Sequence, residues 1–298
     1  MIGAFLLAAC SAPETARIVE SPGSHRARVE LTSVPFYPQT EYFCGPAALA
    51  MALSWSGLDE TPDSVASNVY TPGRQGTLAA DIVSAARRKG RLAIEVDGLD
   101  GLLAEVAAGH PVIVLQNLAL EWFPQWHFAV VVGYDLANRE IVLHSGTTAR
   151  LVRRLDAFER TWSRAGKWGV VTLRPDQLPA RTDRRAVLLA AAGLEQAGRN
   201  DAAAAAYGAI ATRWPNELAA WIGQGNARYA MGEFAAAERA YRAALSRDPQ
   251  MAAAWNNLAN ALHRQGKRDQ AIEAAKLALR NARGDLTAYR DTLEEVSR

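Results

Sequence analysis

One cysteine and one histidine are placed where they could support covalent catalysis. Cys44 stands in "VPFYPQTEYFCGPAALAMALSW" (34–55), directly before an apolar run whose spacing predicts a helix over residues 44–56. The positive end of a helix macrodipole favours a thiolate at that position. His127 opens the strand-like stretch "HFAVVVGYD", and an imidazole across a cleft could accept the thiol proton and later protonate a leaving amine. The alternative for Cys44 is burial as a core residue.

The elements around this pair follow a recognisable order. The pattern predicts an extended lead-in and helices first, and then a mostly antiparallel sheet. A hairpin turn, "LANR", joins its second and third strands, and "KWGVVTLRP" closes the sheet. That order indicates an α+β domain. The predicted lead-in covers 33–37, the further helices cover 78–89 and 100–108, and the strands lie within 110–118, 126–135, 139–146 and 167–175.

Four segments in this order carry a family resemblance. The segments are "VPFYPQTEYFCGPAALAMAL", "GTLAADIVSAARRKG", "AAGHPVIVLQN" and "HFAVVVGYD". Together they resemble the papain-like bacterial cysteine peptidases related to the double-glycine leader (bacteriocin-processing) peptidases, over roughly residues 33–175. The resemblance implies that Cys44 is the nucleophile and His127 its base. It also implies that Gln39 donates to the oxyanion, together with the backbone N–H of Cys44.

The chain departs from that family at two positions. Phe43 stands directly before the nucleophile, where the family often has Asp. More importantly, Ser145 with Gly146 replaces the Asp-Pro pair that supplies the third catalytic member. A serine can orient the imidazole by accepting its Nδ1–H, but it cannot offset the imidazolium charge. We therefore predict that Ser145 orients His127 in a weaker triad.

A second histidine, two acids and three aromatic residues also lie near the predicted pair in sequence. His144 adjoins Ser145 but should face the other side of a regular strand, and neither Asp135 nor Asp156 falls where the family has its acid. Aromatic residues crowd the approach to His127 and could form an apolar rim that grips substrate, or could pack in the core. These aromatic residues are Trp122, Phe123 and Trp126.

No cofactor is predicted for this chain. No Cys/His/Asp/Glu cluster has the spacing of a metal site, and no glycine loop of the phosphate-binding kind occurs.

The C-terminal part of the chain repeats. Gly198, Gly232 and Gly266 are each 34 residues apart, and so are Trp221 and Trp255. This period resembles tetratricopeptide repeats, in which each unit is a pair of antiparallel helices. The resemblance covers 184–298, about three repeats and a capping helix. It implies an all-α solenoid that holds a peptide or partner protein, although a structural spacer or a dimerisation module is the alternative.

The N-terminus resembles the signal of a bacterial lipoprotein. "MIGAFLLAAC" ends in a lipobox-like Leu-Ala-Ala-Cys, which implies lipidation of Cys10 and attachment to a membrane. No Lys or Arg precedes the apolar run, which is a departure from that pattern. Ser11 implies sorting to the outer membrane, facing the periplasm. If Cys10 carries lipid, Cys44 has no disulfide partner within the chain.

Length and charge limit the remaining possibilities. The 298 residues, 49% of them hydrophobic, suggest two soluble domains. The formal net charge of +2 gives no general attraction to nucleic acid, and no later segment has the length of a membrane span. The predicted organisation is a signal remnant at 1–10, a flexible tether at 11–31, the peptidase domain at 32–175, a linker at 176–183 and repeats at 184–298.

The sequence thus predicts an envelope-associated cysteine peptidase whose repeats recruit a substrate or a partner. Two alternatives stay open. The domain could be a weak or inactive papain-like adaptor in an envelope complex, which the replacement at Ser145 favours. The thioester could also be released by an amine rather than by water, which would make the enzyme an acyl or amide transferase.

Overall fold

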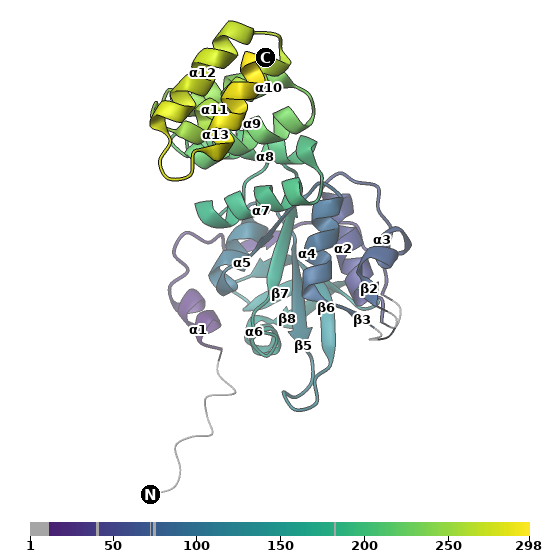
Figure 1. Ribbon diagram of the computed structural model, residues 1–298. Helices are drawn as coiled ribbons and strands as arrows, with labels where there is room; N and C mark the ends of the chain where they lie inside the picture. Colours follow the sequence, from purple (N-terminus) through teal and green to yellow (C-terminus); the bar gives the residue numbers. More distant parts are fainter. Residues whose placement is uncertain (1–11, 40–41, 72, 74–75, 182) are drawn as a thin grey trace, which may run out of the picture. The chain divides into compact units, whose positions relative to one another are not determined.

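The computed structural model describes residues 12–39, 42–71, 73, 76–181 and 183–298. The chain divides into two compact units. The first reaches Arg174 and also includes Pro179–Asp183, and the second includes Pro175–Leu178 and Arg184–Arg298. The described strands all belong to the first unit, and the second unit is helical (Figure 1). The prediction of an α+β domain followed by an all-α solenoid is confirmed.

An antiparallel sheet forms the centre of the first unit. Its strands lie in the order β4-β9-β5-β6-β7-β8, and β1 pairs additionally with β6. A separate ribbon pairs β2 with β3. The strands predicted from the sequence occur as β5, β6, β7 and β9, whereas β4 and β8 were not predicted. The bounds are β1 Arg28–Glu30, β2 Tyr70–Thr71, β3 Gly76–Thr77, β4 Leu92–Glu95, β5 Val112–Asn117, β6 Trp126–Asp135, β7 Glu140–Ser145, β8 Thr148–Arg154 and β9 Gly169–Leu173.

Helix α2 (Cys44–Trp55) packs on one face of this sheet. Nine consecutive residues, from Gly45 to Leu53, are buried, so α2 is enclosed on all sides rather than amphipathic. Phe128, Val130 and Val132 alternate along β6 and belong to the same apolar cluster, because alternate residues of a strand share one face. This packing holds the first residue of α2 at a fixed place beside β6.

Further helices complete the first unit. Two of them pack against α2, namely α3 (Pro62–Val69) and α4 (Ala79–Arg88). Two others, α5 (Gly98–Ala107) and α6 (Leu155–Ser163), pack against strands of the sheet on the other side from α2 (Figure 1). Trp162 of α6 is fully buried, and its Nε1 donates to the carbonyl of Trp168 at 2.7 Å.

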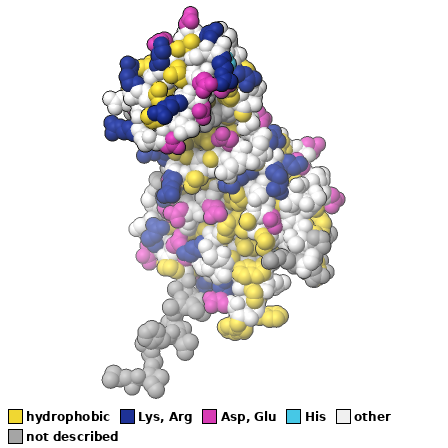
Figure 2. Space-filling view, in the orientation of Figure 1, with side chains coloured by type: hydrophobic (Ala, Val, Ile, Leu, Met, Phe, Trp, Pro, Cys, Tyr) yellow, Lys and Arg dark blue, Asp and Glu magenta, His cyan; other side chains and the backbone are white. Residues whose placement is uncertain are grey.

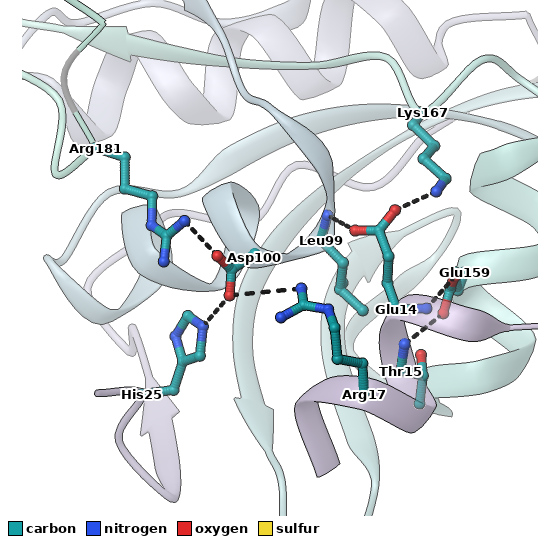
Figure 3. A network of polar contacts seen from close by, with 9 residues as sticks. All are labelled: Glu14, Thr15, Arg17, His25, Leu99, Asp100, Glu159, Lys167 and Arg181. Carbon is teal, nitrogen blue, oxygen red and sulfur yellow. Dashed lines mark hydrogen bonds and ion pairs between the residues drawn. The ribbon is translucent and has the colours of Figure 1, made fainter. Parts of the chain in front are cut away.

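The N-terminal segment differs from the flexible tether that the sequence predicted for 11–31. Residues 12–30 instead carry helix α1 (Pro13–Glu20) and strand β1. The carboxylate of Glu159, which is fully buried in α6, accepts the backbone N–H groups of Glu14 at 3.1 Å and Thr15 at 2.7 Å (Figure 3). It therefore satisfies N–H groups that a helix start leaves unpaired. The polar composition did not reveal this docking because the partner lies about 145 residues away.

Two carboxylates reinforce the docked segment (Figure 3). The carboxylate of Glu14 accepts the N–H of Leu99 at 2.6 Å and pairs with Lys167. The other carboxylate, on Asp100 of α5, pairs with His25 at 2.7 Å and with Arg17 and Arg181. Arg181 belongs to the segment predicted as a linker, and its N–H also donates to the buried Glu105 at 3.3 Å. Part of that linker therefore packs as part of the first unit.

Residues 184–298 form seven helices joined by short turns, over the part of the chain where the sequence predicted the repeats. Three helix pairs are followed by a final helix, as expected for tetratricopeptide repeats. Gly198, Gly232 and Gly266 have φ of 71°, 78° and 73°, the left-handed conformation that lets a helix end in a tight turn. The helices are α7 Arg184–Gln196, α8 Asn200–Arg213, α9 Leu218–Ala230, α10 Phe234–Leu245, α11 Ala252–Arg264, α12 Arg268–Asn281 and α13 Thr287–Ser297.

The repeat also appears in its hydrogen bonds. Trp221 Nε1 donates to the carbonyl of Pro215 at 2.9 Å, and Trp255 Nε1 donates to the carbonyl of Pro249 at 2.8 Å. Each tryptophan thus fixes the break that precedes its own helix. The 34-residue period read from the sequence therefore corresponds to a repeated structural unit.

Candidate active site

Cys44 is the first residue of α2, and a sharp turn of the chain delivers it there. Tyr42 has a φ of 64°, which is unusual for a residue with a side chain, and Phe43 is the N-cap. Gly45 follows because there is no space for a side chain: a Cβ at this position would lie 2.3 Å from Thr77 Oγ1. Close contact with β3 thus sets the position of the thiol.

His127 lies near the start of β6, opposite Gln116 of β5. Its Nε2 is 2.8 Å from Ser145 Oγ. Ser145 therefore contacts His127, as predicted, but through Nε2 rather than through the predicted Nδ1. When the Nε2–H donates to Ser145, the lone pair of Nδ1 remains available to accept a proton. The ring nitrogen was mispredicted because strand pairing brings two residues together without specifying how the imidazole is turned.

A cavity of about 900 Å³ brings the candidate residues together. Cys44, His127 and Gln39 all contribute to its wall, although His127 lies more than 80 residues after the other two in the sequence. No hydrogen bond joins Cys44 to His127 among the described residues, and such contacts commonly tighten only when substrate binds. The other lining residues are Tyr42, Gly76, Thr77, Leu78, Ala79, Leu115, Gln125, Trp126, Phe128 and Gly146.

Gln39 is held firmly at the edge of this cavity. It is 8% exposed, its Oε1 accepts the N–H of Gly146 at 2.8 Å, and its Nε2 donates to the carbonyl of Phe128 at 3.3 Å. An amide nitrogen carries two hydrogens, so one remains for a ligand in the cavity. The N–H of Cys44 begins a helix and has no partner within it. Both residues line the cavity, and their role as oxyanion donors stays a prediction.

Burial dominates the electrostatics of the site. It raises the pKa of the Cys44 thiol above its ordinary value, outweighing the opposite effect of the backbone N–H groups of Phe128, Gly45 and Cys44. Burial also lowers the pKa of His127. The expectation that the helix start favours a thiolate is therefore not met in the free protein, because loss of solvent penalises a charged sulfur more than the helix end favours it. Both shifts favour the uncharged thiol and the uncharged imidazole.

The acids and the second histidine lie elsewhere. His144 is buried, with its Nε2 3.2 Å from the carbonyl oxygen of Val34. Asp156 pairs with Arg154 and Arg160, and Asp135 accepts from Asn138 in the β6–β7 turn. None of these residues lines the cavity, so Ser145 is the side chain that contacts His127.

The aromatic residues that precede His127 are not core residues. Trp122 and Phe123 are 81% and 77% exposed, in the loop between β5 and β6. Figure 2 shows the resulting hydrophobic patch at the end of the unit where Figure 1 places this loop. Of the three predicted rim residues, Trp126 alone lines the cavity, so the other two extend the apolar surface beyond it.

Thr77 is a cavity residue that sequence reasoning missed. It lines the cavity beside Gly45, and its buried Oγ1 has no hydrogen-bond partner among the described residues. The signal was present in "GTLAADIVSAARRKG", a segment of the family resemblance that contains the "GT" pair.

The predicted lipidation site, Cys10, lies outside the described residues. Within the described chain, no helix has both the length and the apolar character needed to cross a membrane.

Comparison with known proteins matches both parts of the chain to families. Residues 31–170 match the Peptidase_C39 like family, and residues 222–285 match the tetratricopeptide repeat. No curated protein matches the chain.

Solved structures similar to parts of the chain fall into the same two groups. A protein described as a C39-like peptidase from Bacillus anthracis is 18% identical, with a TM-score of 0.43; the match covers 50% of this chain and 98% of that one. The Yersinia enterocolitica type III secretion chaperone SycD, in complex with a peptide of the translocator YopD, is 20% identical, with a TM-score of 0.37 and coverages of 39% and 94%. The first TPR of Spaghetti (RPAP3), bound to an HSP90 peptide, is 16% identical, with a TM-score of 0.36 and coverages of 38% and 90%. The family matches and the architecture together show that this chain carries a peptidase C39-like domain followed by tetratricopeptide repeats.

Proposed function

We propose that the first unit is a cysteine peptidase that hydrolyses a peptide bond through Cys44 and His127. The observation that carries this proposal is the convergence of Cys44, His127 and Gln39 on one cavity. A thiol, a base and an amide donor are the groups that acyl transfer requires. Membership of the domain in a peptidase-like family supports the same reaction class.

The geometry suggests the following steps. The Nδ1 of His127 accepts the proton of the Cys44 thiol while Nε2–H donates to Ser145, and the sulfur attacks the carbonyl carbon of the substrate. The Gln39 amide and the Cys44 N–H stabilise the resulting oxyanion. His127 then protonates the leaving amine, and a water molecule releases the second product from the thioester. Because burial favours the uncharged thiol and imidazole, proton transfer accompanies the attack.

We further propose that this peptidase is located in the bacterial cell envelope. The lipobox-like sequence that ends at Cys10 supports a lipid anchor, and Ser11 supports the outer membrane. The tetratricopeptide repeats would recruit a peptide or protein, either the substrate itself or a member of an envelope complex. The cellular fraction that contains the intact protein, compared with that of Cys10→Ala, tests the anchor.

Labelling of the thiol tests the enzymatic assignment. An electrophilic peptide probe should label Cys44 of the folded protein and should fail on Cys44→Ala and on the heat-denatured protein. Strongly reduced labelling of His127→Gln would support the role of the imidazole. Equal labelling of the native and denatured forms would show a merely accessible thiol and would contradict the proposal.

A papain-like adaptor without useful activity is the second candidate. Two observations favour it: Ser145 contacts His127 where a carboxylate could offset the imidazolium charge, and burial raises the pKa of the Cys44 thiol. The pH dependence of thiol alkylation separates the candidates. An enzyme should show a reactive phase that follows the titration of His127, whereas an adaptor should show a single slow phase that follows ionisation of the thiol alone.

A further inference from the structure

A second cavity, of about 530 Å³, adjoins the first at His127. His127, Gln125 and Gly146 line both cavities, while Cys44 lines the first alone and Ser145 the second alone. Residues of β7, β8 and α6 form most of the remaining wall, together with Gln116 of β5 and the loop residues Leu118 and Thr147. The hydroxyl that contacts His127 Nε2 is therefore accessible from a space separate from the one that contains the thiol.

The charge of this second cavity is of one sign. Arg153 is exposed at its wall, and its side chain makes no ion pair or hydrogen bond within the described residues, whereas its backbone belongs to the pairing of β8 with β7. Neither Asp nor Glu is among the described residues that line the cavity. The neighbouring Arg154 differs, because it is bound to Asp156 at 3.0 Å and lies outside the cavity wall. A cationic group without a counter-charge thus shares a cavity with Ser145.

The hydrogen bonds of the catalytic pair require an acceptor in the same place. For Nδ1 to act as the base, Nε2 must carry the hydrogen, and Ser145 Oγ must accept it. The hydroxyl hydrogen of Ser145 then needs an acceptor of its own. Two of the other polar side chains that line the cavity, Gln116 and Thr161, are bonded to each other at 2.6 Å, and Thr161 donates to the carbonyl of Phe158.

We propose that this second cavity binds a carboxylate between Ser145 and Arg153, and that the bound carboxylate completes the catalytic site. This inference deepens the proposed function and rests on it. Ser145 accepts the Nε2–H of His127 and donates its own hydrogen to the carboxylate, while Arg153 neutralises the carboxylate charge. No covalent bond changes, and each hydrogen remains on its own atom. The negative charge stabilises the imidazolium that forms when Cys44 is deprotonated.

Acetate is the probe for this inference. The rate of Cys44 alkylation by iodoacetamide is measured at pH 7 against acetate concentration, with sodium chloride keeping the ionic strength constant. We expect a saturable acceleration of roughly ten-fold, since an adjacent opposite charge shifts a pKa by about one unit or more. Acetamide, which has the same shape without the charge, should have no effect.

Matched variants locate the effect. Arg153→Gln should abolish the response to acetate, and Arg154→Gln, a change of the same kind in the adjacent residue, should leave it intact. Ser145→Asp should react faster without acetate and should gain nothing from it, because the charge is then built in. Loss of the response in Arg154→Gln, or its survival in Arg153→Gln, would overturn the assignment to this cavity.

Experiments with different reporter peptides distinguish the source of the carboxylate. A neutral, amidated reporter peptide that responds to acetate indicates a free small carboxylate. Reporter peptides with an added Glu or a free C-terminus that are cleaved faster, and no longer respond to acetate, indicate a carboxylate supplied by the substrate.

Direct binding keeps this inference separate from the proposed function. The line width of [13C]acetate is measured with the native protein and with Arg153→Gln. Acetate binding that depends on Arg153, without any peptide cleavage, would support the cavity and count against the peptidase. Cleavage without such binding, or equal acceleration by chloride, would sink the inference and leave the peptidase standing.

Discussion

The cavity that contains Cys44 and the helical repeats use glycine for the same steric purpose but depend on it differently. In α9, Gly223 and Gly225 receive the rings of Tyr207 and Tyr241, and an added Cβ would lie 2.5 Å and 2.3 Å from them. At the cavity, Gly45 receives Thr77 at an equally short 2.3 Å. In both regions a missing side chain permits close packing.

The two regions differ in how far the effect of a displaced side chain extends through the structure. Tyr207 of α8 meets a glycine of the next helix pair, and Tyr241 of α10 meets a glycine of its own pair, in each case sixteen residues away along the chain. Contacts of this kind join neighbouring helices only, so their effects on stability stay local. The surroundings of Cys44, by contrast, depend on the positions of β3, β6 and Gln39 at the same time. A small displacement there changes chemistry before it changes stability.

The largest expected effect comes from removing the thiol. Cys44→Ala should lower peptide hydrolysis by roughly 10⁴-fold or more, because no other described side chain of the cavity is a comparable nucleophile. The circular dichroism and the unfolding of the repeats should not change. Retention of more than a few per cent of the activity in this variant would remove the cavity from the mechanism.

Gln39→Ala should produce the next largest effect. Loss of one oxyanion donor costs about 10²–10³-fold in kcat, while KM should change little because the donor acts mainly in the transition state. The same substitution removes the contacts with Gly146 and Phe128, so thermal unfolding is measured in parallel. A variant that is destabilised but keeps its kcat would assign Gln39 a purely structural role.

Two glycine substitutions test the comparison directly. Gly45→Ala should lower kcat by roughly 10²-fold through displacement of the thiol. Gly225→Ala should lower the free energy of unfolding of the repeats by about 1–3 kcal/mol without altering thiol alkylation. Equal effects of both variants on activity would break the distinction between the two regions.

The pH dependence of stability should report the uncharged thiol and the uncharged imidazole. Because the pKa of His127 is lowered on folding, its contribution is complete above about 6.5 and is lost as pH falls through the folded pKa. Because the pKa of Cys44 is raised, its contribution is complete below about 8.5 and is lost as pH rises through the folded pKa. The melting temperature of His127→Gln, relative to the native protein, should therefore differ in its acid limb, and that of Cys44→Ala in its alkaline limb. Limbs that are identical in both variants and the native protein would contradict the pKa shifts.

The smallest effect should come from the exposed loop. Trp122→Ala combined with Phe123→Ala should raise KM for an apolar peptide by several-fold with kcat unchanged, because both side chains lie outside the cavity wall. Leu189→Ala, at a residue of the repeats that is 60% exposed, is the control. Surface substitutions of this kind change stability by less than about 0.5 kcal/mol. A fall in kcat rather than a rise in KM would place the loop nearer to the chemistry than its exposure indicates.

Much of the fold was predictable because it depends on local patterns. The apolar run after Cys44 became α2, the β-branched runs became β5, β6, β7 and β9, and the 34-residue period became paired helices. Strand β8 was missed because most of its residues face solvent, so its sequence does not alternate between apolar and polar residues. Helix α1 was missed because its stabilising carboxylate, Glu159, lies far away in sequence.

The candidate site divides in the same way. The residue types and the order of Gln39, Cys44 and His127 were readable, because each stands at the start of, or just before, a recognisable element. The sequence did not predict three contacts of the site. They are the hydrogen bond between Ser145 and the Nε2 of His127, the two hydrogen bonds of the Gln39 side chain, and the contact of Thr77 with Gly45. They depend on strand register and side-chain rotation, which are set by packing between distant segments.

The sequence by itself thus determined the two-part organisation, the repeat and the identity of the candidate catalytic residues, because helix periodicity, turn glycines and motif order are properties of neighbouring residues. Only the tertiary structure decided that the uncharged thiol and the uncharged imidazole are favoured, since burial of Cys44 and His127 arises from the whole domain. It also decided that Ser145 opens onto a second cavity with Arg153, because β7, β8 and α6 come together only when the sheet is complete.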